Sequence, residues 1–266
     1  MEANIGFLRE LLQAPIKDVR SMLYIYFKQF KAEIDINDLS IVVNPKQAEN
    51  NVILVAHYDT VFNNKKKRVN YYDKVANVMF SPYGLGADDR AGVFGLCYIY
   101  EYCLKHNIKP PVLIFTDMEE IGGYGAEEVA SLYDFYRALF LIELDRRGSK
   151  DVVFYNNEPK EFVKYIEKFG FKESFGSFSD IQILGERWNL CSANISIGYY
   201  YNHTKAEILK VNELFATIEK TIKILQKANT QFKLPERTRE VHKKLSFDDY
   251  YKKWWDDINI DPYEIW

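Results

Sequence analysis

Hydrophobic residues follow two kinds of pattern along this chain. Short continuous apolar runs are typical of strands that are covered on both faces of a sheet. Apolar residues that recur about every three to four positions predict amphipathic helices. The runs predict strands at residues 39–43, 52–56, 112–115, 138–142 and 193–197. The periodic segments predict N-terminal helices on either side of Pro15, and further helices at 91–105, 125–132, 159–169 and 210–227.

This order of strands and helices predicts the fold class. Alternating apolar strands and helices favour an α/β fold: a three-layer sandwich with a mixed, mostly parallel central sheet and helices on both faces. The length of 266 residues suits one large domain, or a domain plus a small appendage. The sequence becomes polar after about Lys227, so we expect a main domain over residues 1–230 and an aromatic-rich C-terminal extension over residues 231–266.

The extension is unusual in its tryptophans. Three of the four tryptophans of the chain, Trp254, Trp255 and Trp266, lie within its last residues. One interpretation is a tail that folds back and covers an apolar patch of the main domain. The other is a contact with a partner or with a second copy in a homo-oligomer, because aromatic side chains anchor interfaces.

Composition and charge narrow the class of protein. Hydrophobic residues make up 47% and charged residues 27%, as in ordinary globular proteins. The formal net charge of -3 argues against a broad nucleic-acid surface. No apolar run approaches the roughly 18–20 residues that span a bilayer, so we expect no membrane association. The start of the chain lacks signal-peptide features, and three cysteines without metal-site spacing indicate free thiols. We therefore expect a cytoplasmic protein.

Histidine and acidic residues follow the predicted strands or begin a helix. They are His57 and Asp59, Asp88 and Asp89, Glu119 and Glu120, Asp145, and His203. Each alone has an ordinary explanation, such as a hydrogen-bonded pair, a solvated turn or a helix cap. Together they carry more weight, because the carboxyl ends of parallel strands meet at one edge of the sheet, where the sites of open α/β folds lie.

The residue types at this edge suit a two-metal site. Imidazole and carboxylate groups are ligands for zinc, cobalt or manganese. Two divalent ions about 3.5–4 Å apart need a carboxylate to bridge them, and a spare carboxylate can serve as a base toward water. Asp59 lies two residues after His57 and can accept a hydrogen bond from the second ring nitrogen of that histidine.

The order of these motifs resembles that of the co-catalytic di-zinc exopeptidases, which include leucyl aminopeptidases, peptidase T-like tripeptidases and tetrahedral aminopeptidases. The resemblance covers roughly residues 5–227. Its motifs are His57-x-Asp59, the stretch from Gly86 to Gly92, Glu119-Glu120, Asp145, and His203-Thr204-x-x-Glu207. The segments between these motifs are too short for the lid domain of many relatives, so the chain resembles a minimal catalytic core.

The resemblance implies a role for each site residue. The metal ligands would be His57, Asp88, Glu120, Asp145 and His203, with His57 and Asp145 on one ion, Glu120 and His203 on the other, and Asp88 shared. Glu119 would be the general base, and Asp59 would orient His57. Asp89 remains the alternative to Asp88. The implied cofactors are two divalent ions, zinc by preference, with cobalt or manganese as alternatives.

The expected function is a metal-dependent aminopeptidase that removes N-terminal residues from peptide substrates. Other hypotheses use the same site as a carboxypeptidase or an N-acyl amidohydrolase, or with a single zinc as a glutaminyl cyclase-like enzyme. A hypothesis of a different class is a non-catalytic binding or scaffold protein that acts through its aromatic tail. The run from Tyr199 to Tyr201 either lines the substrate pocket or packs as ordinary strand residues.

Overall fold

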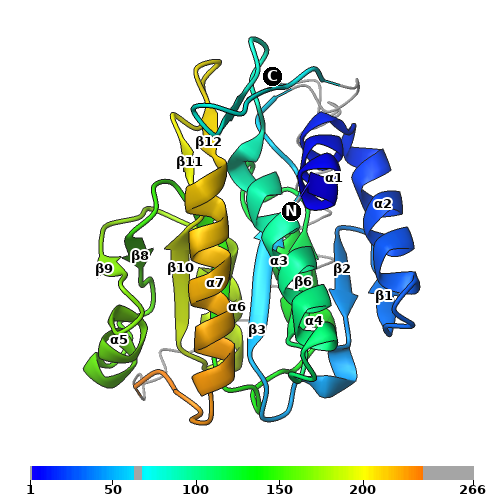
Figure 1. The fold of residues 1–266 in the computed structure, drawn as a ribbon. Helices are drawn as coiled ribbons and strands as arrows, with labels where there is room; N and C mark the ends of the chain where they lie inside the picture. The colour runs from blue at the N-terminus through cyan, green and yellow to red at the C-terminus, as the bar shows by residue number, and fades with distance from the viewer. Residues whose placement is uncertain (1, 63–67, 236–266) are drawn as a thin grey trace, which may run out of the picture.

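The structure, a computed structural model, describes residues 2–62 and 68–235. Its centre is an eight-stranded sheet in the order β1-β2-β6-β3-β7-β10-β8-β9 (Figure 1). Strands β6, β3, β7 and β10 in the middle are parallel. On one side, β2 pairs antiparallel with β6 and β1 with β2; on the other, β8 pairs antiparallel with β10 and parallel with β9. The strands are β1 (Ile34–Ile36), β2 (Ser40–Val43), β3 (Ile53–His57), β6 (Val112–Thr116), β7 (Leu141–Arg146), β8 (Asp151–Val153), β9 (Lys172–Glu173) and β10 (Ser192–Ser196).

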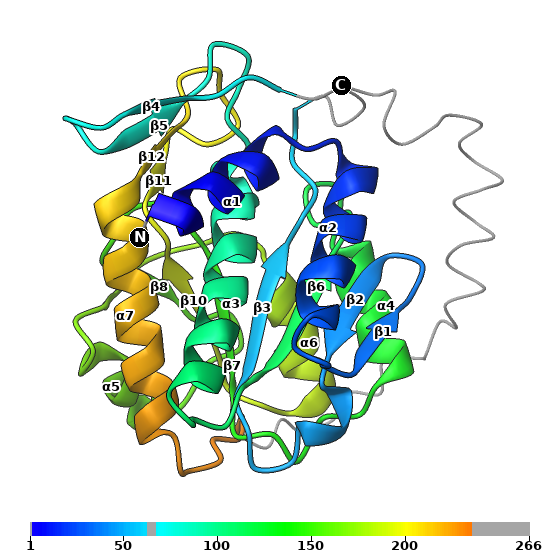
Figure 2. The ribbon, with the colours of Figure 1, turned by 45° about the vertical axis from the view of Figure 1, so that its right-hand side comes forward.

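Both faces of this sheet are buried, as the continuous apolar runs predict. In β3, Leu54 and Ala56 join one hydrophobic cluster with side chains of α1, α2, α3 and α7. Ile53 and Val55 face the opposite way and pack with side chains of α4 and α6. Figures 1 and 2 show α3 and α7 in front of the strands. The three-layer α/β fold is confirmed. The helices are α1 (Glu2–Gln13), α2 (Ile16–Lys28), η1 (Pro45–Gln47), α3 (Ala87–Lys105), α4 (Tyr124–Leu132), α5 (Lys160–Glu167), α6 (Asp180–Trp188) and α7 (Val211–Lys227).

A second, smaller sheet lies above the central one in Figures 1 and 2. Its strand order is β11-β12-β5-β4, and all its pairs are antiparallel. The pairing of β12 with β5 places Leu209 opposite Met79, so two segments far apart in sequence lie side by side. The sequence patterns did not predict this sheet. Its strands are β4 (Tyr71–Asp73), β5 (Val78–Phe80), β11 (Tyr199–Tyr200) and β12 (Ile208–Lys210).

Two elements, β7 and α3, have boundaries that differ by three residues or more from the sequence-based expectation. The strand expected at residues 138–142 begins at Leu141 and ends at Arg146, so Asp145 lies inside the strand rather than after it. The apolar residues before Leu141 are buried in the segment that leads into the strand. Helix α3 begins at Ala87, and Asp88 in its first turn has non-helical dihedral angles.

The start of the C-terminal extension packs against the main domain. The ring of Phe232 contacts those of Phe140, Phe162 and Tyr165, and its backbone bonds to Leu139. Residues 236–266, with the three tryptophans, lie outside the described residues. The predicted domain boundary and the proposed oligomer contact of the tail therefore stay predictions.

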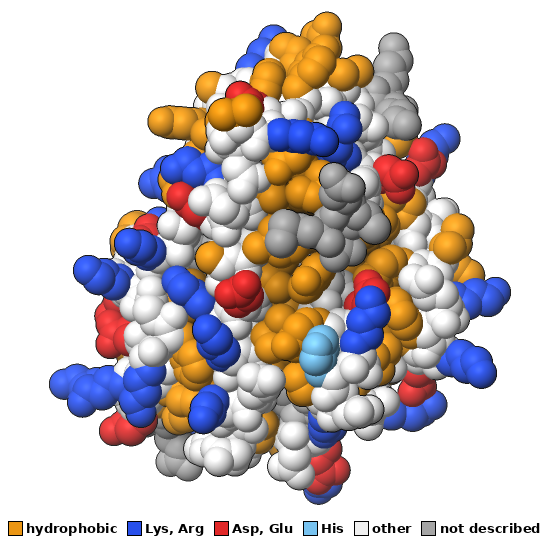
Figure 3. Space-filling view, in the orientation of Figure 1, with side chains coloured by type: hydrophobic (Ala, Val, Ile, Leu, Met, Phe, Trp, Pro, Cys, Tyr) orange, Lys and Arg blue, Asp and Glu red, His pale blue; other side chains and the backbone are white. Residues whose placement is uncertain are grey.

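The surface of the described residues is mixed in charge. Figure 3 shows acidic and basic side chains interspersed, with hydrophobic side chains along the middle of the face where α3 lies. Among the described residues, no helix is long and apolar enough to cross a membrane. The cysteines are buried free thiols.

Candidate metal centre

The residues singled out by their positions after strands come together at one edge of the central sheet. His57 is the last residue of β3, and Asp145 lies near the end of β7. Glu119 and Glu120 follow β6, and Asp88 lies in the first turn of α3. The second candidate histidine, His203, lies in the loop between β11 and β12 of the small sheet.

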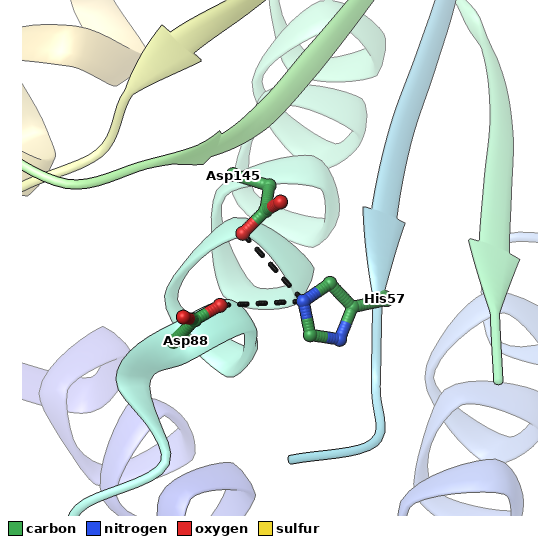
Figure 4. A group of neighbouring side chains, drawn as sticks. All are labelled: His57, Asp88 and Asp145. Carbon is green, nitrogen blue, oxygen red and sulfur yellow. Dashed lines mark ion pairs between the residues drawn. The ribbon is translucent and has the colours of Figure 1, made fainter. Parts of the chain in front are cut away.

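The first group of candidate ligands is His57, Asp88 and Asp145. Nε2 of His57 lies 3.3 Å from Oδ1 of Asp88 and 3.5 Å from Oδ1 of Asp145. Figure 4 shows both carboxylates directed at this nitrogen. The imidazole is buried, and Nε2 has no hydrogen-bond partner. A buried polar atom without a partner is costly, and a cation held by the two carboxylates would satisfy it.

The second group is Asp88, Glu120 and His203. Nε2 of His203 lies 3.1 Å from Oδ2 of Asp88 and 2.9 Å from Oε2 of Glu120. The two oxygens of Asp88 thus approach two different histidines, which is the arrangement expected of a bridging carboxylate. Asp89 has a different place, because it is buried and its Oδ1 accepts a hydrogen bond from the backbone of Gly92.

Asp59 holds more of the site than the sequence indicated. Its Oδ1 lies 3.1 Å from Nδ1 of His57, the contact expected from their spacing. The same carboxylate also accepts hydrogen bonds from the backbone N–H groups of Glu119, at 3.3 Å, and Glu120, at 3.2 Å. Asp59 therefore joins the end of β3 to the turn that follows β6.

The side chain of Glu119 lies beside the first group of candidate ligands. Its Oε2 lies 3.8 Å from Nε2 of His57, and its side chain lines the same cavity as Asp88 and Asp145. Burial raises the pKa of Glu119 well above its usual range, although the charge of His57 opposes that shift. A carboxyl group whose proton affinity has been raised is suited to general base and acid chemistry.

The pKa values of the other ionisable groups are also shifted, because several carboxylates lie close together in the site. Burial and the charge of Asp88 raise the pKa of Asp145 to about 7. Hydrogen bonds to Asp88 and Glu120 raise the pKa of His203 to about 10. For His57, burial lowers the pKa, but nearby carboxylates outweigh it and the net shift is upward. Divalent cations would relieve the repulsion between these carboxylates, and the donor set fits zinc, cobalt or manganese.

Several supporting contacts were not assigned from the sequence. The hydroxyl of Tyr199 donates to Oδ1 of Asp145 at 3.0 Å, and Asn202 donates to Oδ2 of Asp88 at 2.7 Å. Glu207, which is buried, accepts hydrogen bonds from the backbone of Gly86 and Asp88. Asn202 and Glu207 lie close to His203 in sequence. This proximity to a candidate ligand was the only sequence signal that they contribute to the site.

The tyrosine run has divided roles. Tyr199 lines the cavity of the site, Tyr200 donates a hydrogen bond to Glu213, and Tyr201 is exposed. The cavity has a volume of about 500 Å³, within the range of roughly 300–1,000 Å³ typical of small-molecule sites. Its walls combine four of the candidate ligands, Asp88, Glu120, Asp145 and His203, with the segment from Phe175 to Phe178.

The fold and this cluster define an α/β protein with a candidate two-metal centre at the carboxyl edge of its sheet. The model of Peptidase family M28 matches residues 39–180, more than half of the chain. The chain belongs to this family and is a metal-dependent peptidase. No curated protein sequence matches it.

Solved structures with the same fold include three with informative names. Aminopeptidase PepT from Bacillus cereus ATCC 10987 is 15% identical, with a TM-score of 0.69 over 85% of this chain and 98% of that one. A TET aminopeptidase from the marine sediment archaeon Thaumarchaeota archaeon SCGC AB-539-E09 is 12% identical, with a TM-score of 0.69 over 86% and 98%. Porphyromonas gingivalis glutaminyl cyclase is 14% identical, with a TM-score of 0.62 over 85% and 97%. At these identities the likeness shows the fold.

Proposed function

We propose that this chain is a two-metal aminopeptidase. His57 and Asp145 would hold one divalent ion, Glu120 and His203 the other, and Asp88 would bridge both. The observation that carries the proposal is the pair of Asp88 contacts, one oxygen toward each histidine. The names of the PepT and TET structures support the aminopeptidase direction, because both proteins are called aminopeptidases.

Two divalent ions would polarise the scissile carbonyl and lower the pKa of water. Glu119 would accept the proton of the attacking water on its carboxylate and pass it to the nitrogen of the leaving amine. Asp59 would keep Nδ1 of His57 protonated, which leaves Nε2 free to face a metal. Tyr199 and Asn202 would fix the carboxylates of Asp145 and Asp88 through their hydrogen bonds.

The first test is the metal content of the chain by elemental analysis, on protein purified without chelators or metal-binding tags. We expect two divalent ions per chain, and loss of both in Asp88→Asn. Asp73→Asn, at the exposed end of β4, is the control and should keep them. Absence of bound metal after incubation with excess zinc, cobalt or manganese would overturn the two-metal site.

The second test distinguishes the proposed general base, Glu119, from the proposed metal ligands. Glu119→Ala should abolish peptide hydrolysis and keep bound metal, whereas Glu173→Ala on exposed β9 should change neither. Turnover retained in Glu119→Ala would contradict the assigned role.

A panel of free-amine, N-blocked and free-carboxylate substrates distinguishes the proposed aminopeptidase from a carboxypeptidase or an N-acyl amidohydrolase. The glutaminyl cyclase in the comparison makes one further reaction worth including. Formation of pyroglutamate from an N-terminal glutamine, with one metal ion per chain, would favour that activity over peptide hydrolysis.

A further inference from the structure

Two arginines that the proposed chemistry does not use line the cavity of the metal centre. Arg146 is the last residue of β7 and Arg147 follows it, so both come directly after the candidate ligand Asp145. Their backbone is held firmly: the carbonyl of Arg146 accepts a hydrogen bond from Ile197, and that of Arg147 accepts one from Ser196. Both side chains therefore start from a fixed part of the sheet.

Neither arginine has an anionic partner in the part of the chain that the structure describes. Within residues 2–62 and 68–235, no carboxylate forms an ion pair with Arg146 or Arg147, although four carboxylates line the same cavity. Nη2 of Arg146 donates to the carbonyl of Phe175 at 2.9 Å, but its Nε is buried without a hydrogen-bond partner. Elsewhere on the surface, Arg187 pairs with a carboxylate of α4.

Two unpaired guanidinium groups in one cavity fit an anionic ligand. The planar fork of an arginine matches a carboxylate and binds it through two parallel hydrogen bonds. A buried donor without a partner costs stability until a ligand satisfies it. The segment that carries Phe175 and Phe178 lines the same cavity and is tied to β7 by the hydrogen bond from Arg146.

We propose that Arg146 and Arg147 form a subsite for a carboxylate of the substrate, so that the enzyme prefers peptides with a carboxylate close to the scissile bond. This inference rests on the proposed peptidase function of the same cavity. The carboxylate has two sources with the same chemistry: the C-terminus of a short peptide, or an acidic side chain next to the cleaved residue.

The experiment compares Ala-Ala-Ala, its C-terminal amide, and the amide of a tripeptide with glutamate in its second position. Loss of one charge-assisted hydrogen bond costs about tenfold or more. We expect the plain amide to have a kcat/KM at least tenfold below that of the free acid, of the glutamate peptide, or of both. If only the free acid is faster than the plain amide, the subsite binds the C-terminus; if only the glutamate peptide is faster, it binds a side chain; if both are faster, it accepts either carboxylate.

Variants show whether the arginines are responsible. Arg147→Gln changes an exposed side chain, and we expect it to reduce the preference for the free acid mainly through KM. Arg146→Gln should act in the same direction, but it also releases the carbonyl of Phe175, so its thermal unfolding is measured alongside. Arg187→Gln is the matched control and should keep the full preference. Equal hydrolysis of the free acid, the plain amide and the glutamate peptide by the unaltered enzyme would overturn the subsite and leave the peptidase proposal intact.

Binding of the same peptides, measured by calorimetry, separates the two proposals. If no peptide is hydrolysed but the free acid binds at least tenfold more tightly than the amide, and Arg147→Gln removes the difference, the subsite stands without the proposed reaction. If the free acid, the plain amide and the glutamate peptide bind equally or not at all, and no preference appears in hydrolysis, the subsite is refuted.

Discussion

Replacing Asp59 by asparagine tests how the centre is held together. The carboxylate of Asp59 is buried and faces only donors: Nδ1 of His57 and the N–H of Glu119 on one oxygen, and the N–H of Glu120 on the other. Asparagine has the same shape but exchanges one oxygen for an NH₂ group. In either orientation of the new amide, a donor faces a donor.

The size of the effect follows from these contacts. A hydrogen bond to a charged group contributes about 1.5–3 kcal/mol, and a buried unsatisfied donor costs about 1–3 kcal/mol. If the new NH₂ faces Nδ1 of His57, that nitrogen can accept only by moving its proton to Nε2, the atom directed at Asp88 and Asp145. Loss of such a supporting partner typically costs about 10- to 100-fold in metal affinity or activity. We expect Asp59→Asn to fall in this range.

The assay is metal affinity by competition with a chelator, together with kcat and thermal unfolding of the metal-free protein. Asp73→Asn is the matched control, because that carboxylate also accepts two backbone hydrogen bonds, in an exposed turn. It should change metal affinity and kcat less than twofold. If Asp59→Asn also stays within twofold of the unaltered protein in both quantities, the argument from donors facing donors is refuted.

Three further predictions follow from the same structure. Gly92→Ala should lower the free energy of unfolding by about 1–3 kcal/mol in chemical denaturation, because the new Cβ would overlap the backbone oxygen of Leu144. Gly6→Ala is the control: its new Cβ meets open space on α1, so this variant should instead be more stable by about 0.5–1 kcal/mol. Glu207→Gln should weaken metal binding in a chelator titration, because one of its two backbone donors, Gly86 or Asp88, would face an NH₂ group; unchanged affinity would contradict the role. Chelation should lower the melting temperature by several degrees or more, since a ligand at about 1,000 times its Kd adds about 4 kcal/mol of stability; an unchanged melting curve would argue against a bound metal.

The sequence predicts the central sheet well because its strands are buried on both faces. A strand such as β3, with successive residues packed into opposite hydrophobic clusters, must be apolar throughout, and this makes it visible in the sequence. The same rule misplaced β7, because Glu143 and Asp145 lie inside that strand. Glu143 is fully buried, with one oxygen bonded to Ser179. A polar side chain that is satisfied by a distant residue ends an apolar run without ending the strand.

The small sheet could not be predicted for a different reason. Its strands have only two or three residues, too few for an alternating pattern to show. Pairing between Met79 and Leu209 joins distant segments, and local propensity carries no information about such a partner. The identity of the candidate ligands was accessible from motif order, whereas the contacts of Tyr199, Asn202 and Glu207 depend on this long-range pairing.

That unpredicted sheet sets the geometry of the centre. Asn202, His203 and Glu207 all lie between β11 and β12, and all three contact Asp88. Asn202 donates a hydrogen bond to the carboxylate of Asp88, and Nε2 of His203 lies 3.1 Å from the same carboxylate. Glu207 accepts a hydrogen bond from the backbone N–H of Asp88. The partner strand of β12 is β5, which comes shortly before Asp88 in the chain. Pairing of β12 with β5 therefore brings the loop and the shared carboxylate together. The central sheet positions His57, Asp145 and the turn that carries Glu120, whereas the small sheet brings His203 to Asp88. The spacing between two metals would therefore depend on how the two sheets are joined.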